Sequence, residues 1–399
     1  MASIPADVNP DLLIWAREES GYPSDLVAKR IGVRVERLAE WEGGDRKPTV
    51  RQVQELAKSY HRSFGVFFLP QRPTIPPLAA EYRRLPGVLP GVESPEFRLA
   101  LRQMSLRRER TIELNDELAV TGTEFTTPAH ISEGPAAVGR RLRDLLGVTV
   151  ARQMAWRDEW QAWREWRSAV ENIGVLVFQF PKVPLGQVRG VSLLSFPSPV
   201  IGINSKELSA GARIFTLLHE LVHVALALGQ EERVALREGR NESQWAEVER
   251  FAEEAASEAV IPEDALRAAL RTSRASADGW DIAQVRSLAA RFRVTPLAMA
   301  TRLRAAGEMT WEVYARWKDA WTEYVSNLKA RTGGMATPVD KALSRGGRPF
   351  AQLVLEALDA NRITAVDASR YLDLRFDHIA TLRTELVATT GVPGVDDGS

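Results

Sequence analysis

The chain has 399 residues, 45% of them hydrophobic and 26% charged, so it is long enough for two or three globular domains and is not of disordered type. Its 52 basic residues balance 52 acidic ones, which excludes a long-range attraction to nucleic acid or to a membrane through net positive charge. The absence of cysteine excludes disulfides and cysteine-ligated zinc and favours a cytoplasmic protein. No signal sequence and no run of about eighteen apolar residues is found, so we expect no membrane segment.

Residues 1–70 predict a compact helical domain, because apolar residues recur at helical spacing in four short segments. Ser24 and Thr49 are suitable N-caps for two of these helices, and Gly32 lies where a tight turn must join two of them. The segment SDLVAKRIGVRVERLAEWEGGDRKPTVRQVQELA carries a similar pattern of turn and helix residues. Over about residues 9–66 the chain therefore resembles the Xre/Cro-type helix-turn-helix domain.

This resemblance implies a recognition helix at residues 34–41 that would contact duplex DNA. The candidate DNA-binding residues are Arg34, Val35, Arg37, Arg46 and Lys47. DNA-binding domains usually have an excess of basic residues, but residues 1–70 contain ten basic and ten acidic residues. Two alternatives therefore stay open: the balanced total hides a segregated basic patch, or the domain binds protein or dimerises.

A connector is expected at residues 71–150, where a proline-rich stretch excludes a helix up to Pro95. A long amphipathic helix should follow at about residues 96–118, and a short one at about 134–146.

Four tryptophans at helical spacing precede an apolar segment that predicts a strand ending at Phe180; they are Trp156, Trp160, Trp163 and Trp166. Interleaved arginines would also suit a stacking platform for single-stranded nucleic acid. We favour packing against a sheet, because large aromatic side chains on one helix face usually supply buried area. Two further short strands are expected at residues 190–196 and 198–205.

The segment FTLLHELVHVAL contains His219, Glu220 and His223. On a helix, two histidines four residues apart project from one face and can share one tetrahedral ion. Glu220 would lie beside the ion without binding it, where its carboxylate can accept a proton from the attacking water. The alternative is an apolar core helix whose histidines bond to carbonyls, but such a helix gains nothing from three polar side chains that each need a partner. We therefore predict a metal site, with zinc as the ion and manganese as the alternative.

A third protein ligand must come from another helix, expected at about residues 244–260. The candidate carboxylates are Glu247, Glu249, Glu253, Glu254 and Glu258. Glu249 borders the apolar stripe of this helix, and Glu253 lies one turn further along the same flank. The spacing alone leaves the choice between these two open.

Together, RIFTLLHELVHVAL, the later Glu249-x-x-Ala252 and the ending Val260-Ile261-Pro262 resemble the ImmA/IrrE family of metallopeptidases, and the similarity covers about residues 155–307. The resemblance implies that His219, His223 and Glu249 bind zinc and that Glu220 is the general base. Two positions depart from the family pattern, since Glu253 stands where Asn is usual and Ala255 where Phe is usual.

We thus expect a mostly α (α+β) protein. Its parts would be a helix-turn-helix bundle at 1–70, a connector at 71–150, a zincin-like peptidase domain with a small mixed sheet at 151–330, and a small helical C-terminal domain at 338–390. The last part looks like a short helix-turn-helix-like pair, for which we favour a docking role over DNA binding.

The resemblance implies a zinc-dependent endopeptidase and transcriptional regulator in the cytoplasm that cleaves a repressor-type protein in a stress or mobile-element response. Duplex DNA would bind through the N-terminal domain. The alternative is a DNA-binding antitoxin or transcription factor whose metal site is structural or sensory, with a cognate toxin as partner. A second copy of the chain, forming a homodimer, is also considered as a partner.

Overall fold

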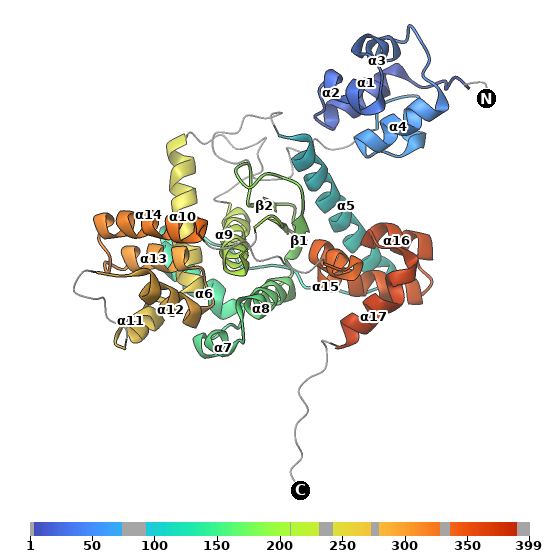
Figure 1. The fold of residues 1–399 in the computed structure, drawn as a ribbon. Coiled ribbons are helices and arrows are strands. Elements are labelled where there is room, and N and C mark those ends of the chain that lie inside the picture. The colour runs from blue at the N-terminus through green and yellow to red at the C-terminus, as the bar shows by residue number, and fades with distance from the viewer. Residues whose placement is uncertain are drawn as a thin grey trace. The chain divides into compact units, whose positions relative to one another are not determined.

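The computed structural model describes residues 4–73, 93–207, 209–230, 242–272, 279–327 and 336–388. The chain divides into two compact units, residues 1–103 and 104–399. Helices dominate both units, and the described residues contain one three-stranded sheet (Figure 1). The predicted mostly α (α+β) fold class is therefore confirmed. Most of the proline-rich connector and most of the linker before the C-terminal helices lie outside the described residues.

The first unit contains a bundle of four α-helices and a 3-10 helix: α1 (Pro10–Glu19), α2 (Ser24–Ile31), α3 (Val35–Glu42), α4 (Val50–Tyr60) and η1 (Phe64–Phe68). Gly32 ends α2 in the left-handed region with φ 70°, and Thr49 caps α4 through a hydrogen bond to the amide of Gln52. Ser24 does not cap α2, because it is the first residue of that helix and Pro23 precedes it without a side-chain bond.

The sheet of the second unit consists of β1 (Leu176–Phe180), β2 (Gly190–Leu193) and β3 (Val200–Asn204), in the order β1-β3-β2. β1 is parallel to β3, and β2 is antiparallel to it, so the predicted mixed sheet is present. β2 ends three residues earlier than the strand expected from the sequence.

Helices lie on both faces of this sheet (Figure 1). On one face are α9 (Ala210–Leu228) and α8 (Glu159–Asn172), which pack against the strands and against each other. On the other face, Met104 of α5 (Pro95–Leu118) lies where a side chain at Gly202 would stand. Phe350 of α15 (Pro338–Asp359) meets the ring of Phe178 edge-on, with centroids 6.1 Å apart. The sheet is thus the middle of three layers.

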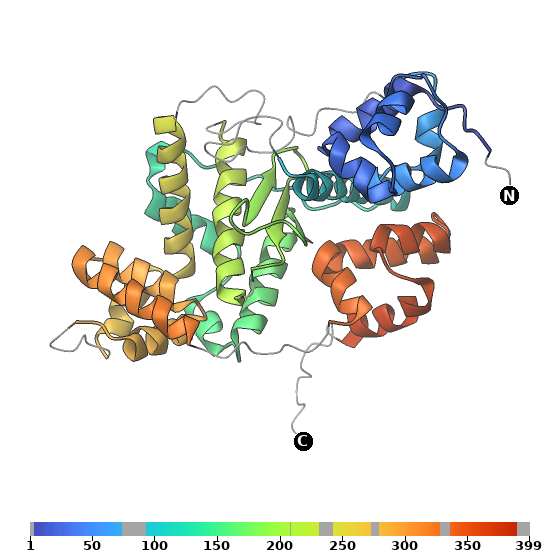
Figure 2. The ribbon, with the colours of Figure 1, turned by 45° about the horizontal axis from the view of Figure 1, so that its top comes forward.

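α10 (Glu242–Val260) runs beside α9 and also packs against α6 (Pro135–Leu145) (Figure 2). A side chain at Gly139 of α6 would stand 2.3 Å from the carbonyl oxygen of Ala255, so the two helices approach closely there. The unit also contains η3 (Ile131–Glu133), α7 (Val150–Ala155), α11 (Glu263–Leu270), α12 (Ile282–Phe292), α13 (Pro296–Ala305) and α14 (Trp311–Ser326).

Three of the four tryptophans behave as core residues. Trp156, Trp163 and Trp166 are buried in the main hydrophobic cluster, as the packing interpretation predicts. Trp160 differs, because it is 42% exposed and its ring lies 5.2 Å from the guanidinium carbon of Arg213. The stripe therefore serves the core and leaves one aromatic ring at the surface.

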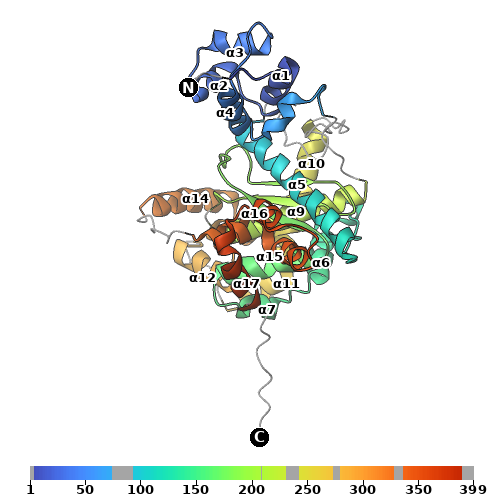
Figure 3. The same ribbon diagram turned by 90° about the vertical axis from the view of Figure 1, so that its right-hand side faces the viewer.

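The C-terminal helices are α15, α16 (Ala365–Leu372), the short η4 (Phe376–His378) and α17 (Ile379–Ala388) (Figure 3). They are anchored by the buried Arg167 of α8, whose guanidinium donates to the carbonyl oxygens of Leu343 and Ser344 and to that of Val177 in β1. α15 therefore forms part of the packing around the sheet, and α16 and α17 pack on α15.

α9 is the helix of the described residues that is long and apolar enough to cross a membrane by length and composition. Its apolar window is 72% buried inside the fold. A core helix of a globular domain has the same properties, so this feature is weak evidence for a membrane span.

Candidate metal centre

Two adjacent helices bring together three of the residues singled out from the sequence. His219 and His223 project from α9, with their Nε2 atoms 3.0 Å apart. From α10, the Glu249 carboxylate places Oε2 3.4 Å from Nε2 of His219 and Oε1 3.6 Å from Nε2 of His223. His223 is fully buried, and Glu249 is 25% exposed, so the cluster sits at the edge of the core.

The spacing of these atoms agrees with a metal site. Ligand atoms about 2.0–2.1 Å from one tetrahedral zinc ion lie about 3.3 Å from each other. The three contacts around the cluster span 3.0 to 3.6 Å. Two imidazole nitrogens and one carboxylate are also a donor set that zinc takes in catalytic sites. The residues present therefore fit the ion that the sequence predicts.

The other glutamates of α10 do not join this cluster in the described residues. Glu247, Glu253 and Glu254 are exposed on the helix surface. Glu258 is buried, but it lies at the far end of α10 and is used in ion pairs. The geometry therefore favours Glu249 over Glu253 as the third ligand.

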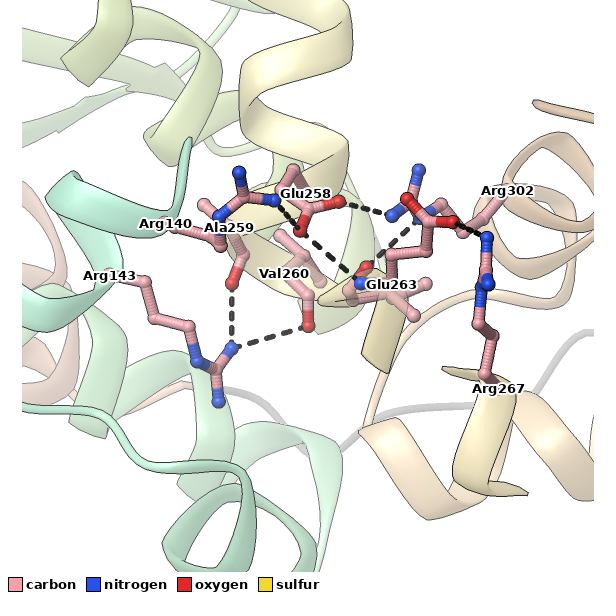
Figure 4. A network of polar contacts seen from close by, with 9 residues as sticks. Arg140, Arg143, Glu258, Ala259, Val260, Glu263, Arg267 and Arg302 are labelled. Carbon is pink, nitrogen blue, oxygen red and sulfur yellow. Dashed lines mark hydrogen bonds and ion pairs between the residues drawn. The ribbon is translucent and has the colours of Figure 1, made fainter. Parts of the chain in front are cut away.

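Glu258 belongs to a polar network that fixes the end of α10 (Figure 4). Its carboxylate pairs with Arg302 of α13 and accepts a 3.2 Å hydrogen bond from Arg140 of α6. Nearby, Arg143 donates a 2.6 Å bond to the carbonyl oxygen of Ala259, and burial lowers its pKa to about 10. Three helices are thus tied together at the end of the helix that carries Glu249.

Glu220 is buried, as His223 is. It is 2% exposed, and its Oε2 accepts a 2.6 Å hydrogen bond from the hydroxyl of Ser192 in β2. β2 can approach α9 this closely because residue 190 is a glycine, at which a side chain would stand 2.5 Å from Thr216. Sequence reasoning missed Ser192, since only the packing of β2 on α9 brings it to Glu220.

One nitrogen of the cluster lacks the usual support. The Nδ1 atom of His219 is buried and has no hydrogen-bond partner in the part of the chain that the structure describes. Metal-binding histidines usually donate their second ring N–H to a carbonyl or carboxylate, which fixes the ring. The orientation of His219 must therefore come from packing, for example from the ring of Phe215, which stacks at 6.4 Å.

The candidate DNA-binding residues lie on and after α3. Arg34 is the N-cap of this helix and is exposed, as are Val35 and Arg46. Arg37 pairs with Glu40 at 3.0 Å and Lys47 with Asp7 at 2.7 Å, and the pairing lowers the pKa of Asp7. Two of the four basic candidates thus have acidic partners in the same domain, so the surface is not a purely basic patch.

Comparison with known families finds a match for each of two regions of the chain. Residues 170–304, which contain the sheet, α9 and α10, match the family model of the IrrE N-terminal-like domain, a peptidase family. Residues 13–67 match the helix-turn-helix family model. One region of the chain is thus similar to IrrE-like peptidases and another to helix-turn-helix domains.

The resemblances drawn from the sequence are therefore confirmed at the level of these families. The IrrE-like domain supports a peptidase, and the helix-turn-helix domain supports DNA binding. No curated protein matches the chain.

Proposed function

We propose that the chain is a zinc-dependent endopeptidase of the HExxH type, with manganese as the alternative ion, and that it acts on a protein substrate in the cytoplasm. The observation that carries this proposal is the meeting of His219, His223 and Glu249 around one position, with Glu220 on the same helix as the histidines. The match of this region to the IrrE-like peptidase family supports it further.

Each residue would have a defined part in hydrolysis. An ion held by the two histidines and Glu249 supplies an electrophile that polarises a peptide carbonyl and acidifies water. The Glu220 carboxylate accepts the proton of the attacking water and delivers it to the leaving amine. Ser192 holds this carboxylate through Oε2 and so limits its rotation. The apolar residues around α9 keep the carboxylate away from bulk solvent.

The substrate would be a repressor-type protein whose cleavage changes transcription in a stress or mobile-element response. This part of the proposal rests on the combination of a peptidase domain and a helix-turn-helix domain in one chain. DNA binding would use the exposed Arg34, Val35 and Arg46, with Arg37 and Lys47 released from their acidic partners. The family matches do not favour the antitoxin alternative, and a toxin partner or a homodimer has no support from them.

The test combines metal content with peptide cleavage. Wild type purified without chelator should hold about one zinc ion per chain, and His223→Ala should lose it. Incubation with a proteome-derived peptide library should then yield new termini for wild type, detected by mass spectrometry, and none for Glu220→Gln that retains the metal. Equal cleavage by wild type and Glu220→Gln would contradict the proposed base. A metal-free wild type that is folded would contradict the site itself.

A further inference from the structure

Two helix pairs, one in each unit, share the same turn. Gly32 after α2 and Asp373 after α16 both adopt the left-handed conformation, with φ 70° and 48°. The next amide in each case bonds back into the helix, from Val33 to Ala28 at 2.9 Å and from Leu374 to Ser369 at 3.0 Å. An extended arginine then begins the following helical segment. α16 and α17 are therefore joined as α2 and α3 are joined in the helix-turn-helix domain.

The turn alone does not identify α16–α17 as a helix-turn-helix, because α12 and α13 are joined in a similar way through the left-handed Arg293. The side chains make the distinction. After Arg293 the chain continues Val-Thr-Pro-Leu-Ala, and this pair packs in the peptidase core. In contrast, Val-Arg-Val-Glu-Arg-Leu-Ala at 33–39 and Leu-Arg-Phe-Asp-His-Ile-Ala at 374–380 have the same residue classes in the same order.

The exposure of the two heptapeptides also agrees at the last six positions, whereas the first differs because Val33 is half-buried and Leu374 is buried. In both, the arginine, the second apolar residue, the acidic residue and the alanine are exposed, the basic residue is half-buried, and the third apolar residue is buried. The exposed members are Arg34, Val35, Glu36 and Ala39 in one unit and Arg375, Phe376, Asp377 and Ala380 in the other. The first set forms the start of the predicted recognition helix.

We propose that α16–α17 is a second helix-turn-helix and that residues 375–380 bind duplex DNA. The inference rests on the proposed DNA binding of the N-terminal domain, because the two surfaces are matched. The chemistry of the exposed side chains suits a DNA groove: Arg375 can bind a phosphate or a guanine edge, and Phe376 and Ala380 can contact thymine methyl groups. Phe376 is 60% exposed, so packing within the unit does not explain this aromatic side chain.

Arg375 can be released at little cost. It pairs with Asp377 at 3.1 Å, but both side chains are more than 70% exposed, and surface pairs of this kind stabilise little. The unit itself is held by the opposite face of α17, where Ile379, Leu382 and Leu386 are buried. Residues 336–388 contain seven basic and seven acidic residues, so binding should depend on direct contacts and not on the net charge of this segment.

The experiment uses the full-length protein and a library of duplex DNA with a randomised centre, followed by sequencing of the bound fraction. Wild type should enrich two separate sequence elements. Arg34→Glu should lose one of them, and Arg375→Glu and Phe376→Ala should each lose the other. On the selected duplex, each variant should bind roughly 5- to 100-fold more weakly in fluorescence anisotropy. Lys341→Glu, an exposed charge change on α15, is the matched control and should bind as wild type does.

The outcomes separate this inference from the proposed function of the first domain. A single element that only Arg34→Glu loses would overturn the second helix-turn-helix and leave the first intact. A single element that only Arg375→Glu and Phe376→Ala lose would support the second and overturn the first. No enrichment by wild type, or an equal loss with Lys341→Glu, would overturn the inference. Circular dichroism and thermal unfolding should be unchanged in each variant, which shows that a loss of binding is not caused by misfolding.

Discussion

The hydroxyl of Ser192 and the carboxylate of Glu220 form a 2.6 Å hydrogen bond between β2 and α9, and both side chains are almost completely buried. A buried carboxylate without a donor is costly, so this bond both satisfies Glu220 and fixes its direction. The strand next to the helix that carries the candidate histidine ligands thus contributes to the position of the proposed catalytic group.

Substitution of Ser192 tests this relationship. Ser192→Ala should lower kcat by about 5- to 100-fold, because the carboxylate loses an orienting bond of about 1–3 kcal/mol. KM and metal content should stay near the wild-type values, since Ser192 touches neither the histidines nor Glu249 in the described contacts. Steady-state kinetics on a peptide found in the cleavage screen, with metal analysis of the same samples, measures both. A variant with unchanged kcat would show that packing alone orients Glu220.

The third ligand can be tested by a matched pair on α10. Glu249→Ala should weaken zinc binding by about 10- to 1,000-fold, because two histidines alone leave the ion with an incomplete protein ligand set. Glu253→Ala removes an exposed carboxylate one turn away and should leave the affinity unchanged. Competition with a chromophoric chelator measures both constants. A larger loss in Glu253→Ala would transfer the ligand role to that residue.

Gly190 is predicted to be intolerant of any side chain. A methyl group there would stand 2.5 Å from Thr216 and 2.9 Å from Cγ of Glu220, so Gly190→Ala should destabilise the fold by about 1–3 kcal/mol and displace β2 from α9. Gly186→Ala is the control, because a methyl group added at Gly186 would meet open space. Its free energy of unfolding should stay within about 1 kcal/mol of the wild-type value. Urea unfolding followed by tryptophan fluorescence compares the two.

The network at the end of α10 should matter for stability. Arg302→Met leaves the buried Glu258 with the more exposed Arg140 as its remaining ion-pair partner, and we expect a loss of about 3 kcal/mol. Arg140→Met removes the more exposed partner and should cost less than about 1 kcal/mol. Thermal unfolding of the metal-free proteins gives the comparison without a contribution from zinc. Equal losses would mean that Arg302 is not the main partner.

The C-terminal helices carry a pair whose contribution depends on pH. Arg383 donates two hydrogen bonds to Asp359, and this lowers the pKa of the carboxyl below its usual value of 3.8. A lowered folded-state pKa stabilises the fold above pH 3.8, and this stabilisation is lost as the pH falls through the lowered value. Arg383→Gln should therefore be less stable than wild type at about pH 6, and the difference should shrink towards about pH 3. Urea midpoints across this range check the trend; a constant difference contradicts it.

The sequence predicted the local elements well and the long-range contacts poorly. Helical periodicity and the spacing of His219 and His223 placed α9, and the apolar stripe around Glu249 placed α10. These features depend on residues that are near one another in the chain. The bond from Ser192 to Glu220 and the exposure of Trp160 depend on how the strand and helices pack, and no local pattern carries that information.

The N-terminal domain shows the same division. Thr49 caps α4 as its residue type predicts, because a cap bonds to an amide three positions away. The pairing of Lys47 with Asp7 joins residues from separate segments, so a count of charges could not tell whether the basic side chains are unopposed. The left-handed turn at Asp373 was also hard to foresee, because aspartate adopts this conformation less readily than glycine.

The packing of α15 on β1 has a consequence for the order in which the peptidase domain can be completed. β1 is synthesised early, whereas its partner Phe350 and the carbonyl groups that accept from Arg167 come much later. Between Phe180 and Pro338 lie 157 residues, which a ribosome needs about 8 to 30 s to add. During that interval Phe178 lacks its aromatic partner and Arg167 lacks two of its acceptors. The packing around the sheet therefore stays incomplete on the ribosome after the residues of the candidate metal centre have been joined.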